Sequence, residues 1–537
     1  MALLTLLLAC DATVRTTVVG GDTGPVDTPC QQLWFDDADG DGFGAGTGQA
    51  ACEAPEGWVE NGADCDDADR EVNPAAEEVC EDGLDNNCDG TARGCTPLGI
   101  RKLDEGDVSI LGEAEEDDLG EVLAMAGDLN GDGHDDLAIG APYARGATGY
   151  ASVFLGPLET SATLSEADRL WSGPNSGDYL GVSVTGAGDL NGDGFDDLAI
   201  GALGDDQIAS GAGAVYLIHG PSLALDLEAA TGVLLGRDAG EETGARVHSA
   251  GDLDGDGLAD LLIGAPGHHD GGRVYIVHGP VTATYNLAIA DTVFTGQSTS
   301  DGAGETVAVG DLNGDGHADY AIGAPSADGL ASDGGMVYVV PGPVGAEVSL
   351  DQVAGRVWGG SWDRLATSLA IPGDLDLDGV DELVAGSPYV DIDDSDQGRA
   401  YLFLEPVEGS VDADSAPVHF SGEIGHDHFA ATVSGAGDVN GDGWADLLIG
   451  APYNDFGGGD AGATYLFYGP LTASRSGTTA DAKFTGPVSS ELLGTGLAGQ
   501  GDLDADGLDD LAMGALGVRW DGQTTGGVYV VRAGDRL

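Results

Sequence analysis

Aspartate residues recur in this chain in a pattern that could bind hard cations. A nine-residue loop beginning at Asp128 places side-chain oxygens at positions 1, 3, 5 and 9, with Gly133 at position 6. Oxygens at alternate positions, a backbone carbonyl at position 7 and a glycine for the sharp turn can surround Ca²⁺. Similar loops begin at Asp189, Asp252, Asp311, Asp374, Asp438 and Asp502. The sequence therefore predicts seven Ca²⁺ sites.

Each predicted site combines four side chains with the carbonyl of the seventh residue. The predicted ligands are Asp128, Asn130, Asp132, His134, Asp136; Asp189, Asn191, Asp193, Phe195, Asp197; Asp252, Asp254, Asp256, Leu258, Asp260; Asp311, Asn313, Asp315, His317, Asp319; Asp374, Asp376, Asp378, Val380, Glu382; Asp438, Asn440, Asp442, Trp444, Asp446; and Asp502, Asp504, Asp506, Leu508, Asp510. Glu382 departs from the pattern; its longer side chain can still reach an ion, and we expect a lower affinity there.

The loops do not match an EF-hand, which needs Glu at position 12 and flanking helices. Position 12 of the first loop is Ile139, inside an apolar run, so the loops are expected in β-hairpins. Three or four carboxylates a few ångströms apart repel one another unless a cation neutralises them. We therefore expect cation binding to be coupled to the folding of each hairpin. The alternative is a set of acidic turns that hold no metal.

The overall charge excludes one class of partner. The chain has 537 residues with 18 Lys+Arg against 94 Asp+Glu, a formal net charge of −76. Such a protein will not bind nucleic acid by neutralising phosphates. Seven Ca²⁺ ions would still leave about −62, so most of the acidity solvates the surface. The 93 glycines disfavour long helices, and the 42% apolar content excludes a disordered acidic tail.

The elements that carry the loops form a repeat. From residue 107 onward the loops recur every 59 to 64 residues. Each unit reads as a strand, a Leu-Gly-like pair, a second strand, the acidic loop, a Leu-x-Ile-Gly-Ala-Pro strand and a Gly-x-Val-Tyr-Val strand. Four short strands per unit are typical of a propeller blade. The sequence predicts an all-β, seven-bladed β-propeller, in which the strand at Val108 to Leu111 completes the last blade and removes its free edge.

These repeats resemble the FG-GAP repeats of the integrin alpha β-propeller, which also occur in bacterial surface proteins. The resemblance covers residues 107 to 537 and implies calcium in β-hairpin loops on one face. It does not imply an integrin receptor, because an inserted I-like domain and leg domains are not found in this sequence. No copy reads Phe-Gly, and Gly-Ala-Pro is replaced at Gly201-Ala202-Leu203, Gly386-Ser387-Pro388 and Gly514-Ala515-Leu516.

A smaller module precedes the repeats, over residues 30 to 95. Its cysteines are Cys30, Cys52, Cys65, Cys80, Cys88 and Cys95, and its candidate metal ligands are Asp37, Asp39, Asp41, Asp85, Asn87 and Asp89. Six cysteines in a short exported segment predict disulfides whose pairing stays open; zinc is the alternative, without CxxC pairs to favour it. The module resembles the metal-binding motif of MopE-like bacterial surface proteins and the calcium-wrapped thrombospondin type 3 repeats. A solvated acidic linker stapled by disulfides is the alternative.

The first ten residues predict export. The apolar run from Ala2 ends in Leu7-Leu8-Ala9-Cys10, which resembles the lipobox of bacterial lipoproteins and implies lipidation of Cys10. No Lys or Arg precedes the run, so a start further upstream, an ordinary secretory signal or a chance apolar start are alternatives. Residues 11 to 29 read as a flexible tether and residues 96 to 106 as a linker. We expect an extracytoplasmic protein of the bacterial envelope or surface, anchored by lipid or secreted.

The face opposite the acidic loops is the predicted ligand face. Its exposed-looking residues include Tyr143, Arg145, Trp362, Tyr389, Tyr453 and Trp520, together with His268, His269, Phe456 and Arg519. Aromatic residues suit protein or carbohydrate recognition, although each could simply pack a blade edge. No nucleophile, zincin or nucleotide-binding motif is found. We expect a monomeric calcium-binding adhesion protein that is not an enzyme; a carbohydrate-active propeller enzyme and a purely structural envelope protein are the alternatives.

Overall fold

A computed structural model describes residues 33–38, parts of 43–88, 99–103, 108–115, 117–221, 227, 230, 232–329, 331–392 and 394–533. The chain divides into two compact units, Met1–Gly94 and Cys95–Leu537. The first contains a small antiparallel sheet in the order β2-β1-β3. Its strands are β1 (Leu33–Asp36), β2 (Ala45–Ala50) and β3 (Trp58–Val59).

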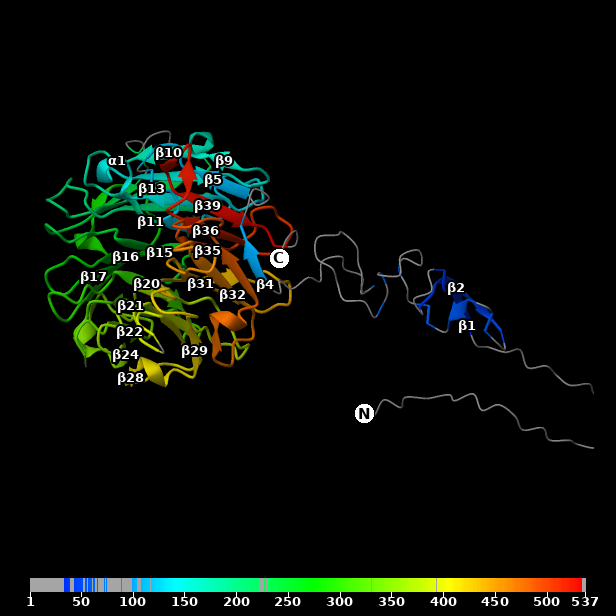
Figure 1. The fold of residues 1–537 in the computed structure, drawn as a ribbon. Coiled ribbons are helices and arrows are strands. Elements are labelled where there is room, and N and C mark those ends of the chain that lie inside the picture. Colours follow the sequence, from blue (N-terminus) through cyan, green and yellow to red (C-terminus); the bar gives the residue numbers. More distant parts are fainter. Residues whose placement is uncertain are drawn as a thin grey trace, which may run out of the picture. The chain divides into compact units, whose positions relative to one another are not determined.

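The second unit is built from seven sheets that follow one another along the chain (Figure 1). The first four contain, in order, β6 (Val122–Met125), β7 (Leu137–Ala141), β8 (Tyr150–Phe154) and β10 (Arg169–Ser172); β11 (Leu180–Gly188), β12 (Asp197–Ala202), β13 (Ala214–His219) and β14 (Gly232–Leu235); β15 (Arg246–Gly251), β16 (Asp260–Ala265), β17 (Arg273–Val277) and β19 (Thr292–Thr295); and β20 (Thr306–Gly310), β21 (Asp319–Ala324), β22 (Met336–Val340) and β24 (Gly355–Trp358).

The last three sheets follow the same order of strands. They contain β25 (Ser368–Ala370), β26 (Leu383–Ser387), β27 (Arg399–Phe403) and β29 (Val418–Ser421); β30 (Thr432–Gly437), β31 (Asp446–Ala451), β32 (Ala463–Phe467) and β34 (Ala482–Thr485); and β35 (Leu493–Gly501), β36 (Asp510–Ala515), β39 (Gly527–Val531) and β5 (Val108–Leu111). As the sequence predicts, β5 joins the end of the chain, pairing antiparallel with β39.

Most sheets gain a fifth, parallel strand that the sequence analysis does not anticipate. The strands β18 (Tyr285–Asn286), β23 (Glu347–Ser349), β28 (Ser410–Asp412), β33 (Arg475–Ser476) and β9 (Ala162–Thr163) each pair with the outer strand of the preceding sheet. The sixth sheet is covered instead by β4 (Gly99–Lys102), which pairs with β34. The predicted linker at 96–106 thus contains a strand that covers a sheet edge.

Short helices lie in the connections between strands. They are α1 (Ala144–Ala147) and the 3₁₀ turns η1 (Leu164–Glu166), η3 (Leu287–Ile289), η4 (Leu350–Gln352), η5 (Ala413–Ser415) and η6 (Gly477–Thr479), and a hairpin of β37 (Arg519–Trp520) and β38 (Gln523–Thr524) lies between β36 and β39. No helix in the described residues is long and apolar enough to cross a membrane.

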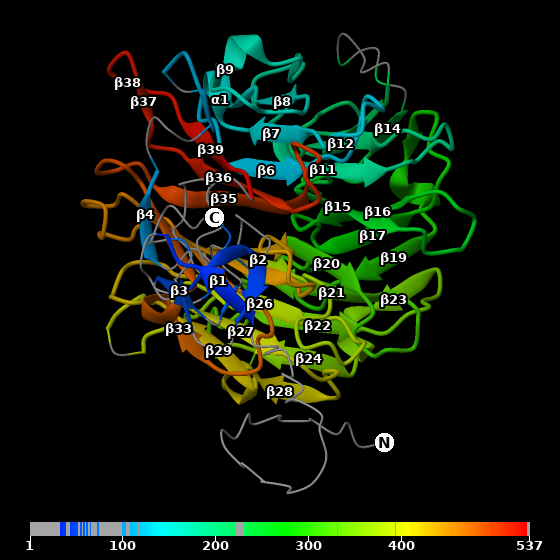
Figure 2. The same cartoon turned by 90° about the vertical axis from the view of Figure 1, so that its right-hand side faces the viewer.

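The core lies between neighbouring sheets. The second strand of every sheet is buried along its whole length, as in β12 and β31. One apolar cluster combines Leu137 and Ile139 of the first sheet with Ala512 and Val528 of the last. Figure 2 shows β6 and β35, the inner strands of these two sheets, side by side. The last sheet therefore packs on the first in the same way as two sheets that are consecutive in sequence pack on each other.

Candidate metal centres and the opposite face

The acidic loops join the first and second strands of each sheet, so all of them lie at one end of the sheets, named here the acidic face. In the first loop Asp128 Oδ1 accepts hydrogen bonds from the N–H groups of Gly131 (2.6 Å) and Asp132 (3.0 Å), and Oδ2 accepts one from Gly133 (2.9 Å). The first residue of every other loop accepts similar bonds. These bonds fold each loop around its first carboxylate.

The ninth residue of each loop is the first residue of the buried second strand or directly precedes it, and it is itself buried. Asp136 Oδ2 accepts the N–H of Leu129 and Oδ1 that of Gly156, each at 2.9 Å. Burial raises the pKa of Asp136 to about 7, although these two hydrogen bonds act to lower it. Burial likewise raises the pKa of Asp197, Asp446 and Asp510 to about 7.

The fifth loop brings four carboxylates together. Oxygens of Asp374, Asp376, Asp378 and Glu382 lie within 4.8 Å of one another. Glu382 Oε2 accepts the N–H of Leu375, whereas Oε1 is buried without a hydrogen-bond partner. Burial raises the pKa of Glu382 to about 8. An all-oxygen set with an unpartnered buried carboxylate oxygen fits a hard divalent cation.

Residues at position 8 connect the loops of adjacent sheets, a role that the sequence analysis missed. Asp196 Oδ2 accepts the N–H of Asp128 at 2.9 Å, and Asp381 and Asp509 act in the same way on the fourth and sixth loops. Asp135 Oδ2 accepts the N–H of Asp502 at 2.9 Å, linking the first loop to the last. The third, fourth and sixth loops carry alanine at this position.

Loops at the other end of the sheets form the opposite face, which contains the predicted ligand residues. The exposed fractions are 54% for Tyr143, 64% for Trp362, and 43% for both Tyr453 and Trp520. Ile424, Phe456 and Val488 are also exposed in loops at this end. Large apolar side chains thus reach solvent here from consecutive sheets, the fifth to the seventh and the first.

The remaining predicted ligand residues pack against their neighbours. The Tyr389 ring packs at a tilt against His428, with ring centroids 4.9 Å apart, and His428 packs edge-on against Tyr453 at 4.8 Å. The Arg145 guanidinium lies 5.6 Å from the Tyr150 ring centroid. Tyr389 is half-buried, so it supports the exposed Tyr453 ring rather than offering a free surface.

The expectation that His268 is exposed is wrong. Its side chain is fully buried, whereas that of His269 is 75% exposed. Nδ1 of His268 accepts the N–H of Asp270 at 3.2 Å, and Nε2 lies 3.4 Å from Asp238 Oδ2. These contacts hold the ring inside the loop after β16. The expectation failed because the sequence pattern alone cannot tell a packed histidine from a solvated one.

A second set of seven carboxylates, also missed, lies near the opposite face. Each stands two residues before the first residue of the Leu-Gly-like pair, a regular position that could have identified them: Asp117, Asp178, Glu241, Asp301, Asp363, Asp427 and Glu491. Asp117 Oδ2, for example, accepts the N–H groups of Glu113 and Ala114. These carboxylates cap the turns that lead from one sheet to the next.

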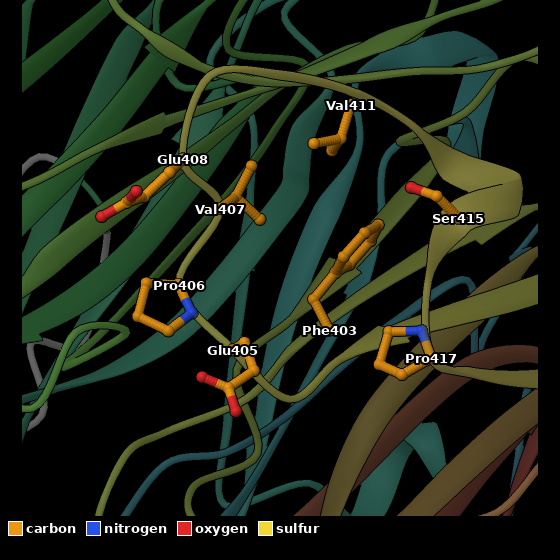
Figure 3. A pocket seen from close by; sticks show the side chains of 8 residues that line it. All are labelled: Phe403, Glu405, Pro406, Val407, Glu408, Val411, Ser415 and Pro417. Atoms are coloured by element: carbon orange, nitrogen blue, oxygen red, sulfur yellow. The ribbon is translucent and has the colours of Figure 1, made fainter.

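The hollows in the described part of the sheets include a central one and one beside the fifth sheet. The central one, about 450 Å³, is lined by the inner strands of all seven sheets and includes Glu121, Arg246 and His248. The other, about 650 Å³, lies under the connection between β27 and β29. Figure 3 shows Phe403 and Val411 in its lining, with Glu405 and Glu408 on the connecting loop. Neither hollow gathers a set of groups that indicates catalysis.

The described residues of the first unit contain a disulfide between Cys65 and Cys88, which bears out the prediction of disulfides and gives a pairing that the sequence left open. Asp37 donates its backbone N–H to the carbonyl of Gly57 at 3.1 Å. Many predicted residues of this unit lie outside the described residues, so their roles stay predictions: Cys10, Cys30, Cys52, Cys80, Cys95, Asp39, Asp41, Asp85, Asn87 and Asp89.

The repeated sheets and acidic hairpin loops define a β-propeller protein of the integrin-alpha-like class. The family model described as "FG-GAP repeat" matches residues 120–154, 180–218, 244–277, 303–340, 366–403 and 429–467. The chain therefore carries six FG-GAP repeats. The seventh unit lies outside these matches, and it is identified by the pairing of β35, β36, β39 and β5. A second model, the copper-binding MopE family described as a "putative metal-binding motif", matches residues 64–92. The chain thus also carries a MopE-like metal-binding motif.

Curated relatives share parts of the chain. Integrin alpha pat-2 of Caenorhabditis briggsae is 30% identical over 226 residues, which are 38% of this chain and 17% of that protein. Integrin alpha-PS2 of Drosophila melanogaster is 31% identical, over 40% of this chain and 15% of its own length. Phosphatidylinositol-glycan-specific phospholipase D of Bos taurus is 29% identical over 63% of this chain and 43% of that protein. The chain thus spans less than half the length of these relatives.

Proposed function

We propose that this protein is a calcium-stabilised extracellular binding or adhesion protein that recognises its ligand with the opposite face. The observation that carries the proposal is the set of exposed aromatic side chains in that face, led by Trp362, Tyr453 and Trp520. Exposed tryptophan and tyrosine are the side chains that most often anchor protein ligands, and their flat apolar rings also stack on sugars. Similarity to integrin alpha chains supports the same reading.

Calcium has a structural part in this proposal. The acidic loops gather oxygen ligands with the spacing that Ca²⁺ prefers, and the FG-GAP and MopE-like matches support metal binding. Ions in the loops would hold one end of every sheet and leave the loops of the opposite face free to vary. In this proposal the propeller holds about seven Ca²⁺ ions, and the MopE-like module binds further ions.

Export is also part of the proposal. The disulfide between Cys65 and Cys88 supports an oxidising compartment, since disulfides persist outside the reducing cytosol. Lipidation at Cys10 would keep the protein at a membrane surface of a bacterial envelope. We propose binding rather than catalysis, because no set of catalytic groups gathers in the described residues.

The calcium part is tested by calorimetric melting of the full chain in excess Ca²⁺ and in EGTA, with bound metal counted by mass spectrometry. We expect a higher melting temperature with Ca²⁺ and about seven or more ions per chain. Equal melting temperatures and no bound calcium would refute the metal sites.

The recognition part is tested on arrays of extracellular proteins and glycans, comparing the wild type with Trp362→Ala, Tyr453→Ala and Trp520→Ala. The matched control is Leu377→Ala, because Leu377 is also exposed but lies in an acidic loop. We expect each aromatic variant to lose a ligand that the control retains. A ligand that survives all three aromatic substitutions would place recognition elsewhere, and turnover of an arrayed glycan would favour the enzyme alternative.

A further inference from the structure

The fifth acidic loop differs from the other six in how its ninth residue is hydrogen-bonded. In those six loops both carboxylate oxygens of the ninth residue accept a hydrogen bond. Asp197 accepts the N–H groups of Leu190 (2.9 Å) and Gly220 (3.0 Å), and Asp136, Asp260, Asp319, Asp446 and Asp510 are likewise bonded at both oxygens. These carboxylates are therefore satisfied by the protein itself.

Glu382 lacks the second donor. It accepts the N–H of Leu375 with Oε2, and its buried Oε1 has no partner. The residue 23 positions after Glu382 is Glu405, where the second loop has Gly220 at the same separation. Two departures from the repeat thus coincide: a longer acid at position 9, and Glu405 in place of the residue whose N–H bonds the ninth residue elsewhere, as Gly220 does in the second loop and Ala533 in the seventh. A buried carboxylate oxygen left unpaired destabilises the cation-free loop.

The fifth loop also has no basic partner. The third, fifth and seventh loops each carry four carboxylates. In the third, His278 Nδ1 lies 2.9 Å from Asp260, and in the seventh Arg532 lies 3.8 Å from Asp504. Across the described part of the chain, no ion pair joins a basic side chain to the four carboxylates of the fifth loop. Glu405, on the loop in Figure 3, instead adds negative charge near Asp376.

From these observations we propose that the fifth loop binds its divalent cation more tightly than the sixth or the seventh loop. Affinity is the difference between the bound and the cation-free state, and the cation-free fifth loop contains an unpaired buried oxygen and unneutralised charge. This reverses the expectation that Glu382 weakens the site. The inference rests on the proposed calcium function, and it identifies the fifth loop as the one that retains its ion as the free calcium concentration falls.

Terbium luminescence can read the loops one at a time, because Tb³⁺ replaces Ca²⁺ and is excited by a nearby tryptophan. Trp444 is the seventh residue of the sixth loop and reports that site in the wild type. Val380→Trp with Trp444→Phe moves the reporter to the fifth loop, and Leu508→Trp with Trp444→Phe moves it to the seventh. Trp444→Phe alone is the blank. The full chain is titrated with chelator-buffered Tb³⁺.

We expect the fifth-loop reporter to reach half-saturation at a free Tb³⁺ concentration about tenfold below that of the seventh-loop reporter. A factor of about ten corresponds to the free energy gained when one unpaired buried polar group finds a partner. Adding Glu382→Asp and Glu405→Gly to the fifth-loop reporter restores the repeat pattern and should remove this advantage, with calorimetry confirming the fold. Equal or weaker binding at the fifth loop would overturn the inference, as would an advantage that survives the double substitution. Absence of luminescence at every loop would instead refute the calcium sites.

Discussion

Lys483 offers a test of how the packed sheets tolerate acidity. The chain contains two lysines, Lys102 and Lys483. The Lys483 side chain is 5% exposed, and its Nζ lies 2.8 Å from Glu423 Oε2 and 4.4 Å from the Phe456 ring centroid. Replacing Lys483 by methionine removes the charge and keeps most of the volume, so it leaves Glu423 without its counter-ion.

The expected loss of stability follows from the burial of the pair. Removing one partner of a buried ion pair costs about 3–5 kcal/mol, and we expect about 3 kcal/mol because Glu423 is 16% exposed. With an unfolding entropy of about 2.1 cal/mol/K per residue, this corresponds to a fall in melting temperature of about 3 °C for the unit Cys95–Leu537.

The loss should also depend on pH. Burial raises the pKa of Asp427 to about 6, while Lys483 lowers it. A carboxyl whose pKa is higher in the folded than in the unfolded state loses stability as pH rises between the two values. Removing Lys483 raises the pKa of Asp427 further, so the loss should be larger at pH 7.5 than at pH 5.

The assay is calorimetry in excess Ca²⁺ at both pH values, with Glu423→Gln alone and combined with Lys483→Met to complete a double-mutant cycle. Lys102→Met is the matched control, because Lys102 is exposed; it should change the melting temperature by less than about 1 °C. The reasoning would be refuted if Lys483→Met melted within that margin at pH 7.5, or if Glu423→Gln recovered none of the loss.

Three further predictions concern protons, backbone and the disulfide. In EGTA the protein should melt higher at pH 5.5 than at pH 8, because the pKa of Asp136 is raised to about 7 by burial and stability falls as pH rises toward that value; excess Ca²⁺ should remove this fall. Gly181→Ala should unfold the protein or destabilise it by more than about 3 kcal/mol, because at φ +86° the added Cβ would lie 2.2 Å from the Tyr150 carbonyl oxygen. The control is Gly177→Ala, which has a similar φ and no atom within 4 Å of the added Cβ. In urea unfolding it should lower the free energy of unfolding by about 1 kcal/mol. Cys65→Ser should make Cys88 reactive toward a maleimide in the native protein, whereas the wild type should not react at this position.

Local sequence patterns predict most of the fold. The period of the acidic loops and the alternation of apolar runs with Gly-rich turns predict the repeat and its strands, because hairpin neighbours are close in sequence. The same reasoning predicts that Val108 to Leu111 pairs at the end of the chain, as β5 does with β39. It could not find β4 on the sixth sheet, because β4 precedes the first repeat and so has no place in the repeat pattern that predicts the partner of β5.

The sequence and the tertiary structure also determine different features of the acidic loops. By itself the sequence predicts which oxygens could gather in each loop, because the predicted ligands lie within nine residues. Only the tertiary structure decided which carboxylates are already satisfied, because the second N–H donor comes from a different strand, as Gly156 does for Asp136. It also decided that His268 is buried and that Glu382 is left with an unpaired oxygen. Burial and hydrogen bonding depend on neighbours that pairing of distant strands brings together, and no local pattern encodes those neighbours.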